Sequence, residues 1–97
     1  MEELEELASK LEALGHPVRL KLVATLRLDG PQYLSELAKK AGVSRALAKV
    51  HLVRLQRAGI VKSRVVLSQK EAKALRYYEL VDFSILVSPD EIVRLMR

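Results

Sequence analysis

The feature that most constrains the fold is a pair of short helical patterns joined at Gly42. The first pattern runs from Leu34 to Ala41 with apolar residues at helical spacing, and the second begins after Ser44. Gly42 can turn the backbone through positive φ without a side-chain clash, and the Ser44 hydroxyl can accept a backbone N–H of the second helix's first turn. Two helices joined by so short a turn predict a helix-turn-helix over residues 34–58.

The same region carries a concentrated positive charge. Between residues 37 and 70 the chain has nine lysines or arginines and no acidic residue, although it has 12 acidic residues in all. The formal net charge of +5 alone would suit any basic protein. A cluster of this kind needs a polyanion or open solvent around it, and its place on a helix-turn-helix favours DNA as the polyanion.

The second helix of the pair has two different faces. Ala48, Leu52 and Leu55 recur at i, i+4 and i+7 and predict a side that faces the core, with His51 at its edge. In a helix-turn-helix the second helix enters the major groove, and its first residues lie nearest the base edges. The side expected to face outward carries Ala46, Lys49, Val50, Val53 and Arg57.

Both ends of the chain predict helices suited to a dimer contact. A narrow seam of leucines with 3-4-3 spacing predicts a helix over residues 2–14. Such a seam is more typical of a contact across a dimer than of an ordinary core helix. The seam consists of Leu4, Leu7, Leu11 and Leu14. Residues 88–97 predict a last helix with Ser88 as N-cap, Pro89 at N1 and Glu91 completing a capping box. So short a helix needs a packing partner, and the seam is the obvious one. Its apolar residues are Ile92, Val93, Leu95 and Met96.

A further helix is predicted over residues 17–28, before the helix-turn-helix. Val18, Leu22, Val23 and Leu26 form its inner face, and Arg19, Lys21 and Arg27 lie outside. His16, which precedes Pro17, is interpreted as the residue at the helix entry. His51 is interpreted as a helix-face residue that packs or hydrogen-bonds near the following strands. Residues 32–33 are long enough only for a bridging strand.

Residues 60–83 predict a two-stranded wing. The segments IVKSRVVL (60–67) and LRYYELV (75–81) are rich in β-branched and aromatic residues, and Lys62, Arg64 and Val66 alternate with Val61, Ser63 and Val65. The polar tip, residues 68–74, carries Lys70 and Lys73. It is either a tight hairpin or a helical turn, because Ser68 and Glu71 also form a capping-box pattern. Residues 83–87 are apolar enough to prolong the second strand.

Several classes of protein are not supported by the sequence. The chain has no cysteine and only two histidines, one in each of two distant elements, so we expect no disulfide and no metal site. It has no apolar run long enough to span a membrane and no secretory signal at its acidic N-terminus. No catalytic set or phosphate-binding loop is present, so we expect no enzyme activity and no cofactor. The expectation is a single domain over residues 1–97, cytoplasmic and associated with the nucleoid.

Three segments resemble the ArsR family of prokaryotic winged helix-turn-helix transcription regulators. They read LGHPVRLKLVATL, YLSELAKKAGVSRALAKVHLVRLQRAGIVKSR and RYYELVDF, and together they span about Leu11 to Phe83. The resemblance implies a mainly α fold with a small β-wing, in the order α-α-α-α-β-β-α. It also implies a homodimer built on the first and last helices, residues 1–14 and 88–97, which binds a pseudo-palindromic operator and often acts as a repressor.

The resemblance assigns the groove contacts residue by residue. The family's groove-contacting positions are Ser44, Arg45, Ala46, Leu47, Lys49 and Val50. We expect further cations to hold phosphates: Lys39, Lys40, Arg54, Arg57, Lys62, Arg64, Lys70 and Lys73.

The chain departs from the family pattern in ways that leave alternatives open. Polar base readout is thin, because Leu47, Lys49 and Val50 stand where the family favours small polar residues and a histidine. Val50 and Ala46 can contact thymine methyls, while Arg45 and Lys49 reach guanine edges or phosphates. If they reach only phosphates, a chromatin-like protein of low sequence preference results. The exposed valines also suit a protein-interaction module. The cysteine and histidine ligands of the family's metal sensors are missing, and the sequence indicates no small-molecule effector.

Overall fold

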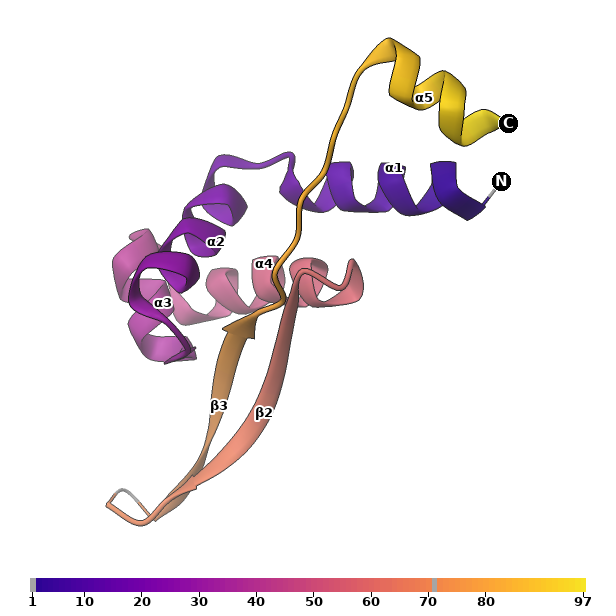
Figure 1. The fold of residues 1–97 in the computed structure, drawn as a ribbon. Coiled ribbons are helices and arrows are strands. Elements are labelled where there is room, and N and C mark those ends of the chain that lie inside the picture. Colours follow the sequence, from indigo (N-terminus) through magenta and orange to yellow (C-terminus); the bar gives the residue numbers. More distant parts are fainter. Residues whose placement is uncertain (1, 71) are drawn as a thin grey trace.

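The computed structural model describes residues 2–70 and 72–97. Over these residues the chain forms five helices and one three-stranded antiparallel sheet, so the predicted winged helix-turn-helix fold is confirmed (Figure 1). The elements in chain order are α1 (Glu2–Leu14), α2 (Pro17–Asp29), β1 (Gln32–Tyr33), α3 (Leu34–Ala41), α4 (Arg45–Arg57), β2 (Val61–Ser68), β3 (Lys73–Leu80) and α5 (Pro89–Met96).

The turn between α3 and α4 has the predicted chemistry. Gly42 adopts the left-handed conformation with φ 73° and ψ 30°, and the Val43 amide donates to the Ala38 carbonyl at 3.1 Å. The Ser44 hydroxyl accepts a hydrogen bond from the Leu47 amide at 3.1 Å and caps α4. These bonds satisfy one backbone group at the end of α3 and one at the start of α4, and they help to fix the direction in which α4 leaves the turn.

The core lies where α2, α3, α4 and the base of the sheet meet. Its fully buried members are Leu22, Leu37, Leu52, Leu55, Ile60, Val61 and Tyr78. One prediction for α2 is wrong, because Arg19 is not outside but only 9% exposed. Its Nη2 donates to the Glu12 carbonyl at the end of α1, 3.5 Å away. The aliphatic stem of arginine tolerates such burial, which a purely polar label for the residue does not anticipate.

The wing is a hairpin of β2 and β3 that projects from the helical body (Figure 1). Its register pairs Val61 with Leu80 at the base and Ser68 with Lys73 at the far end, and β1 adds a short third strand beside β3. The two strands pair as far as Ser68 and Lys73, so the tip closes a hairpin, and residues 69, 70 and 72 lie in a turn. The predicted capping box there involves residue 71, which lies outside the described residues.

The expected extension of the second strand is not observed. The strand β3 ends at Leu80 because its partner β2 begins at Val61, and the Val81 amide makes one more bond, to the Ile60 carbonyl at 2.8 Å. Residues 81–88 then run without regular structure up to α5. Apolar composition alone does not form a strand where no neighbouring strand can accept its hydrogen bonds.

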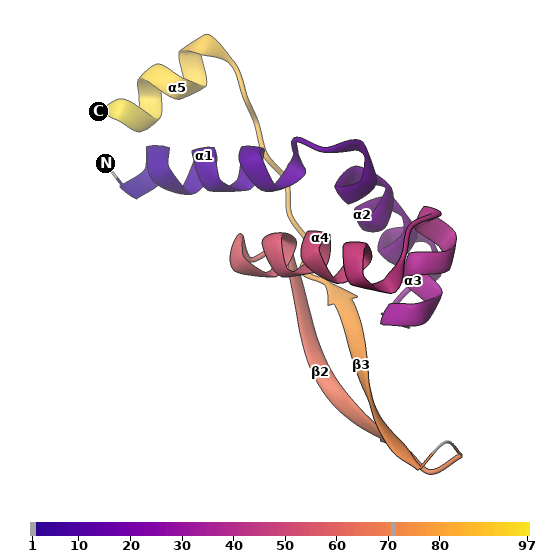
Figure 2. The same cartoon turned by 180° about the vertical axis from the view of Figure 1, so that it is seen from behind.

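Helices α1 and α5 form a layer at the opposite end of the molecule from the wing tip (Figure 2). As predicted, α5 packs on α1 and Ser88 caps it, the Ser88 hydroxyl accepting from the Glu91 amide at 3.0 Å. The carboxylate of Glu91, expected to complete the capping box, accepts instead from the Arg94 guanidinium, which lowers the pKa of Glu91.

Candidate nucleic-acid interface

The outer face of α4 is an open groove with an apolar floor and a basic rim. Its lining residues recur at helical spacing and enclose about 420 Å³; they are Ala46, Lys49, Val50, Val53, Arg54 and Arg57. Ala48, Leu52 and Leu55 occupy the opposite side and are fully buried. Packing of those three side chains therefore presents the groove to solvent, as the sequence pattern predicts. Figure 2 shows α4 running between α1 and the long strands of the wing.

A second, smaller cleft separates the start of α4 from the wing. It encloses about 230 Å³, and Arg45, Lys73 and Arg76 bring three cationic side chains to it beside the hydroxyl-bearing Tyr33 and Ser35. Phosphate oxygens are acceptors that such donors bind well. Arg76, Tyr33 and Ser35 are absent from the set predicted from the sequence. The strand register, which pairs Arg76 with Val65 across the hairpin, is the signal that would have placed Arg76 here.

Arg76 also connects the wing to α4. Its Nη1 donates to Ser63 Oγ at 3.2 Å, and Ser63 Oγ donates to Gln56 Oε1 at 3.2 Å. Because Gln56 lies on α4 and Ser63 on β2, this chain of bonds spans the two elements expected to touch DNA. Side-chain hydrogen bonds as well as the backbone therefore orient the wing relative to α4, which is called the recognition helix below because it is the second helix of the helix-turn-helix.

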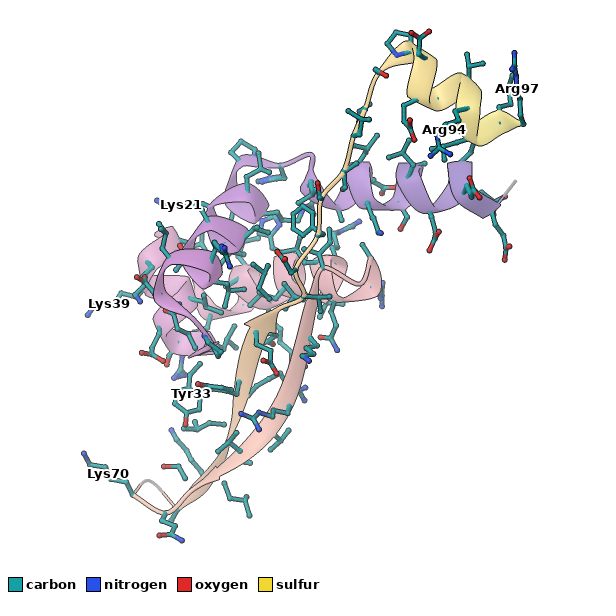
Figure 3. All side chains as sticks on the ribbon, viewed as in Figure 1. Lys21, Tyr33, Lys39, Lys70, Arg94 and Arg97 are labelled. Atoms are coloured by element: carbon teal, nitrogen blue, oxygen red, sulfur yellow. The ribbon has the colours of Figure 1, made fainter. Side chains whose placement is uncertain are left out.

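The two lysines of α3 differ in their surroundings. The ammonium group of Lys40 lies 3.1 Å from Asp29 Oδ2 and 2.6 Å from Oε1 of the buried Gln32. Lys40 therefore holds the end of α2 against α3, a structural role that the sequence analysis missed. Lys39 is exposed and points away from the helical body (Figure 3).

The wing carries its cations along the strands and at the tip. Lys62 lies 3.8 Å from Glu79, and the guanidinium of Arg64 lies over the Tyr77 ring at 5.2 Å. The Tyr77 ring also meets that of Tyr33 edge to face, at 5.0 Å. Lys70 projects from the tip, well away from Arg94 and Arg97 on α5 (Figure 3). The wing thus extends the basic surface away from the α1–α5 layer.

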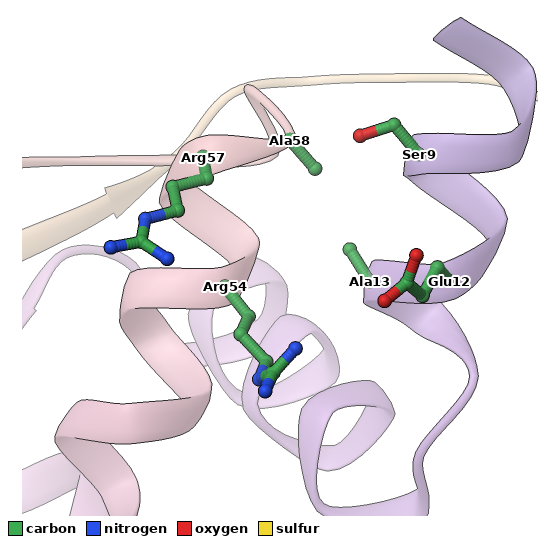
Figure 4. Close-up of a pocket in the computed structure, with 6 residues that line it drawn as sticks. All are labelled: Ser9, Glu12, Ala13, Arg54, Arg57 and Ala58. Atoms are coloured by element: carbon green, nitrogen blue, oxygen red, sulfur yellow. The ribbon is translucent and has the colours of Figure 1, made fainter. Parts of the chain in front are cut away.

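The carboxyl-terminal half of α4 borders a crevice against α1. Arg54 and Arg57 contribute two cations to it and Glu12 one carboxylate, around a volume of about 150 Å³ (Figure 4). The same two arginines line the outer groove of α4. Their side chains therefore stand at the edge of the recognition face, where they can reach a phosphate beside the groove.

The two histidines lie together behind the interface, contrary to their prediction as residues of distant elements. The rings of His16 and His51 are 4.5 Å apart, so His51 packs against the residue at the start of α2. His16 acts at the helix entry as predicted, because its Nδ1 accepts from the Val18 amide at 3.1 Å. Burial, followed by the charges of His16, Arg19 and Arg54, lowers the pKa of His51.

A metal site and a membrane-spanning helix are two features that the described residues do not form. Among residues 2–70 and 72–97, no three His, Cys, Asp or Glu side chains converge as metal ligands would. Within the same residues, every helix is too short or too polar to cross a membrane.

Comparison with known proteins decides the family. A helix-turn-helix domain family model matches residues 14–64, more than half of the chain. A curated but uncharacterized HTH-type transcriptional regulator of Methanocaldococcus jannaschii is 34% identical over 86 residues, covering 89% of this chain and 87% of that protein. The chain belongs to the ArsR-type helix-turn-helix family. A second relative, the biofilm growth-associated repressor of Xylella fastidiosa, is 38% identical over 74 residues. The match covers 71% of this chain and 64% of the repressor.

Solved structures of ArsR-type and related regulators share the fold. The transcriptional repressor BigR of Xylella fastidiosa superimposes with a TM-score of 0.67 at 28% identity, covering 97% of this chain and 82% of that one. A transcriptional regulator homologue of Pyrococcus horikoshii gives 0.66 at 28%, covering 99% and 88%. A homodimeric winged helix-turn-helix DNA-binding domain of Mycobacterium bovis, described as a possible ArsR-family regulator, gives 0.68 at 22%, covering 95% and 72%, and so bears on the fold alone.

Proposed function

We propose that this ArsR-type regulator acts as a homodimer that binds a pseudo-palindromic site in double-stranded DNA and represses transcription, without enzyme activity or a metal sensor. The observation that carries the proposal is the outer face of α4, which is exposed and whose charged residues are all basic. A helix with this face fits the major groove of a duplex, whose flanks are lined by phosphates. The repressor relatives support the regulatory outcome.

The proposal gives each part of the basic surface a role. The first turns of α4, residues 44–50, lie nearest the base edges. Arg54 and Arg57 and the wing hold phosphates, and the cleft with Arg45 and Arg76 holds a further phosphate. Lys40 contributes through its hold on Asp29 and Gln32 more than through DNA, because its ammonium group already has two partners.

The dimer contact is proposed at α1 and α5. Leu95 and Arg94 of α5 border the crevice against α1, whereas Ile92, Val93 and Met96 are 41%, 42% and 56% exposed. A helix with apolar side chains on both sides needs a second packing surface. A second copy of the chain supplies it by pairing the same α1–α5 layers around a two-fold axis, and the two recognition helices then address two half-sites.

Binding to DNA is tested by titration at several salt concentrations. We expect the logarithm of the association constant to fall with the logarithm of salt by about 0.9 per phosphate neutralised. The paired substitutions Arg45→Glu and Lys49→Glu should reduce binding at least tenfold, because both bring negative charge to the groove. Lys21→Glu, at an exposed site on α2 outside this surface, is the matched control and should change binding little. A flat salt response with no protected duplex would contradict the proposal.

The apolar groove supports one alternative, a winged-helix module that binds a protein. Val50 is exposed and Val53 is half-buried, and together they offer an apolar contact of the kind that protein interfaces use. The unbroken basic block over residues 37–70 argues against it, since a protein partner rarely requires so many cations. The same charge-reversal variant discriminates the two, because it should leave an apolar protein contact nearly intact.

A further inference from the structure

We propose that the outer face of α4 selects DNA through the C5-methyl groups of thymine, with Val50 as the central contact and Ala46 and Leu47 beside it. The inference rests on the proposed DNA-binding function and deepens it by naming the chemical group that is read. In this proposal the groove on α4 binds the major-groove surface of a DNA duplex and no other partner.

The composition of this face leaves few groups for hydrogen-bonded readout. Specific hydrogen bonds to adenine come mostly from Asn or Gln, and those to guanine from Arg or Lys. The only amide side chain on α4, Gln56, accepts a hydrogen bond from Ser63 and ties the wing to the helix. The Ser44 hydroxyl is engaged in capping the helix at the Leu47 amide. Both groups therefore already hold intramolecular partners.

Apolar side chains occupy the centre of the face instead. Ala46 and Val50 lie one turn apart and line the floor of the groove, with Val53 on the next turn. Val50 is 53% exposed and Leu47 is 44% exposed. Among the four bases, thymine alone presents a methyl group in the major groove, and apolar side chains contact it. Burying these side chains against methyl groups is therefore a way in which the centre of this face can gain affinity from the bases.

The charges around the groove match the same occupant. Lys49 and Arg54 both line the groove, and helical spacing places them on opposite sides of its apolar floor, while Arg57 lies at its carboxyl-terminal end. Phosphates flank the major groove on both sides, so cations at the rim and apolar groups at the centre fit its cross-section. A protein partner with an apolar centre would not need cations on both flanks.

The experiment replaces thymine by deoxyuridine, which removes the methyl and keeps every hydrogen-bonding edge of the pair. The probe is a duplex that the protein itself enriches from a random pool, synthesised with thymine or with deoxyuridine and titrated by fluorescence anisotropy. We expect wild-type binding to weaken roughly fourfold for each methyl contacted. Replacing thymines one at a time locates the contacted positions.

Variants assign the effect to the side chain. Val50→Ala should weaken binding to the thymine duplex and lose most of the difference between the two duplexes. Val50→Thr, which keeps the shape and exchanges one methyl for a hydroxyl, should show an intermediate difference. Val87→Ala is the matched control, since Val87 is 47% exposed in the segment before α5, and it should retain the full wild-type difference.

The outcomes separate failure of this inference from failure of the proposed function. Equal binding of both duplexes by the wild type, with a steep salt dependence, overturns methyl reading and leaves DNA binding in place. An equal loss on both duplexes for Val50→Ala, with an unchanged thermal unfolding curve, overturns the role of Val50. No salt-dependent binding to any duplex overturns the proposed function, and the inference with it.

Discussion

At the scale of single residues, the contact between His16 and His51 has consequences for stability. His51 is only 6% exposed, and no hydrogen-bond partner for its Nδ1 lies among the described residues. The groups that face it are His16, Arg19 and Arg54, from the start of α2, from α2 itself and from α4. A proton on His51 would therefore add a positive charge to a cluster of basic side chains. This cluster lies where α4 meets the first two helices.

This arrangement predicts that acid destabilises the fold through His51. The pKa of His51 lies below its ordinary value of 6.5. Below pH 6.5 the unfolded chain therefore binds more protons at this residue than the folded chain. The free energy of unfolding then decreases as the pH is lowered, until the pH reaches the lowered pKa of the folded chain. We expect a slope of up to about 1.4 kcal/mol per pH unit in that window, measured by urea unfolding.

Two variants assign the slope to one histidine. His51→Leu should flatten the dependence on pH, because the titrating group is gone. His16→Asn keeps an acceptor at the N-cap of α2 and should retain most of the slope. A slope that survives in His51→Leu would assign the acid sensitivity to other groups.

The same residues show where sequence reasoning stops. Helical periodicity identified the buried Ala48, Leu52 and Leu55, because the repeat distance of a helix is fixed. It did not anticipate the burial of Arg19 and Gln32 or the meeting of His16 and His51. Those contacts depend on how helices far apart in the sequence cross, and a one-dimensional pattern does not contain that angle.

At the scale of elements, the turns depend on local backbone conformation. Gly42, between α3 and α4, has φ 73°, and a Cβ at this position would meet nothing within 4 Å. The cost of Gly42→Ala is therefore conformational, and we expect about 1–2 kcal/mol of lost stability by chemical unfolding. Ala72, at the wing tip, already has φ 51°.

The opposite substitution at the wing tip is the matched control for Gly42. Ala72→Gly should leave stability unchanged or raise it by less than about 1 kcal/mol, because relief of strain is offset by the freer unfolded chain. If Gly42→Ala proves neutral, the turn must be able to leave the left-handed conformation.

Elements with local signals were predictable, and those that depend on a partner were not. Ser44, Ser88 and Gly42 act as the sequence indicated, because caps and turns are decided within a few residues. The end of β3 at Leu80 is decided by where β2 begins, and the hairpin closure by the pairing of Ser68 with Lys73. The same limit applies to the cleft beside α4: the sequence did not indicate that Arg76 lines it, because the position of Arg76 depends on strand register.

At the scale of the whole molecule, the wing tip and the proposed dimer contact lie at opposite ends of the longest dimension. The molecule extends 53 Å by 23 Å by 22 Å, with the wing tip at one end and the α1–α5 layer at the other (Figure 1). The apolar side chains exposed at the α1–α5 end include Leu11, Leu86, Ile92, Val93 and Met96. Pairing two copies there leaves both basic surfaces open. Once one subunit of the dimer binds its half-site, the other subunit is held at high effective concentration near the second half-site, and the overall affinity increases.

Dimerisation is therefore expected to control DNA affinity. Ile92→Glu combined with Met96→Glu should produce a monomer in sedimentation equilibrium, because two charges would enter an apolar contact. DNA binding by that variant should weaken by about 10²-fold or more, since each half-site is then bound alone. Leu28→Glu is the matched control, because Leu28 is 82% exposed on α2 and lies outside the proposed contact. If the double variant still forms dimers, the contact lies elsewhere. If it is monomeric yet binds the full site as tightly as the wild type, the two recognition helices do not act together.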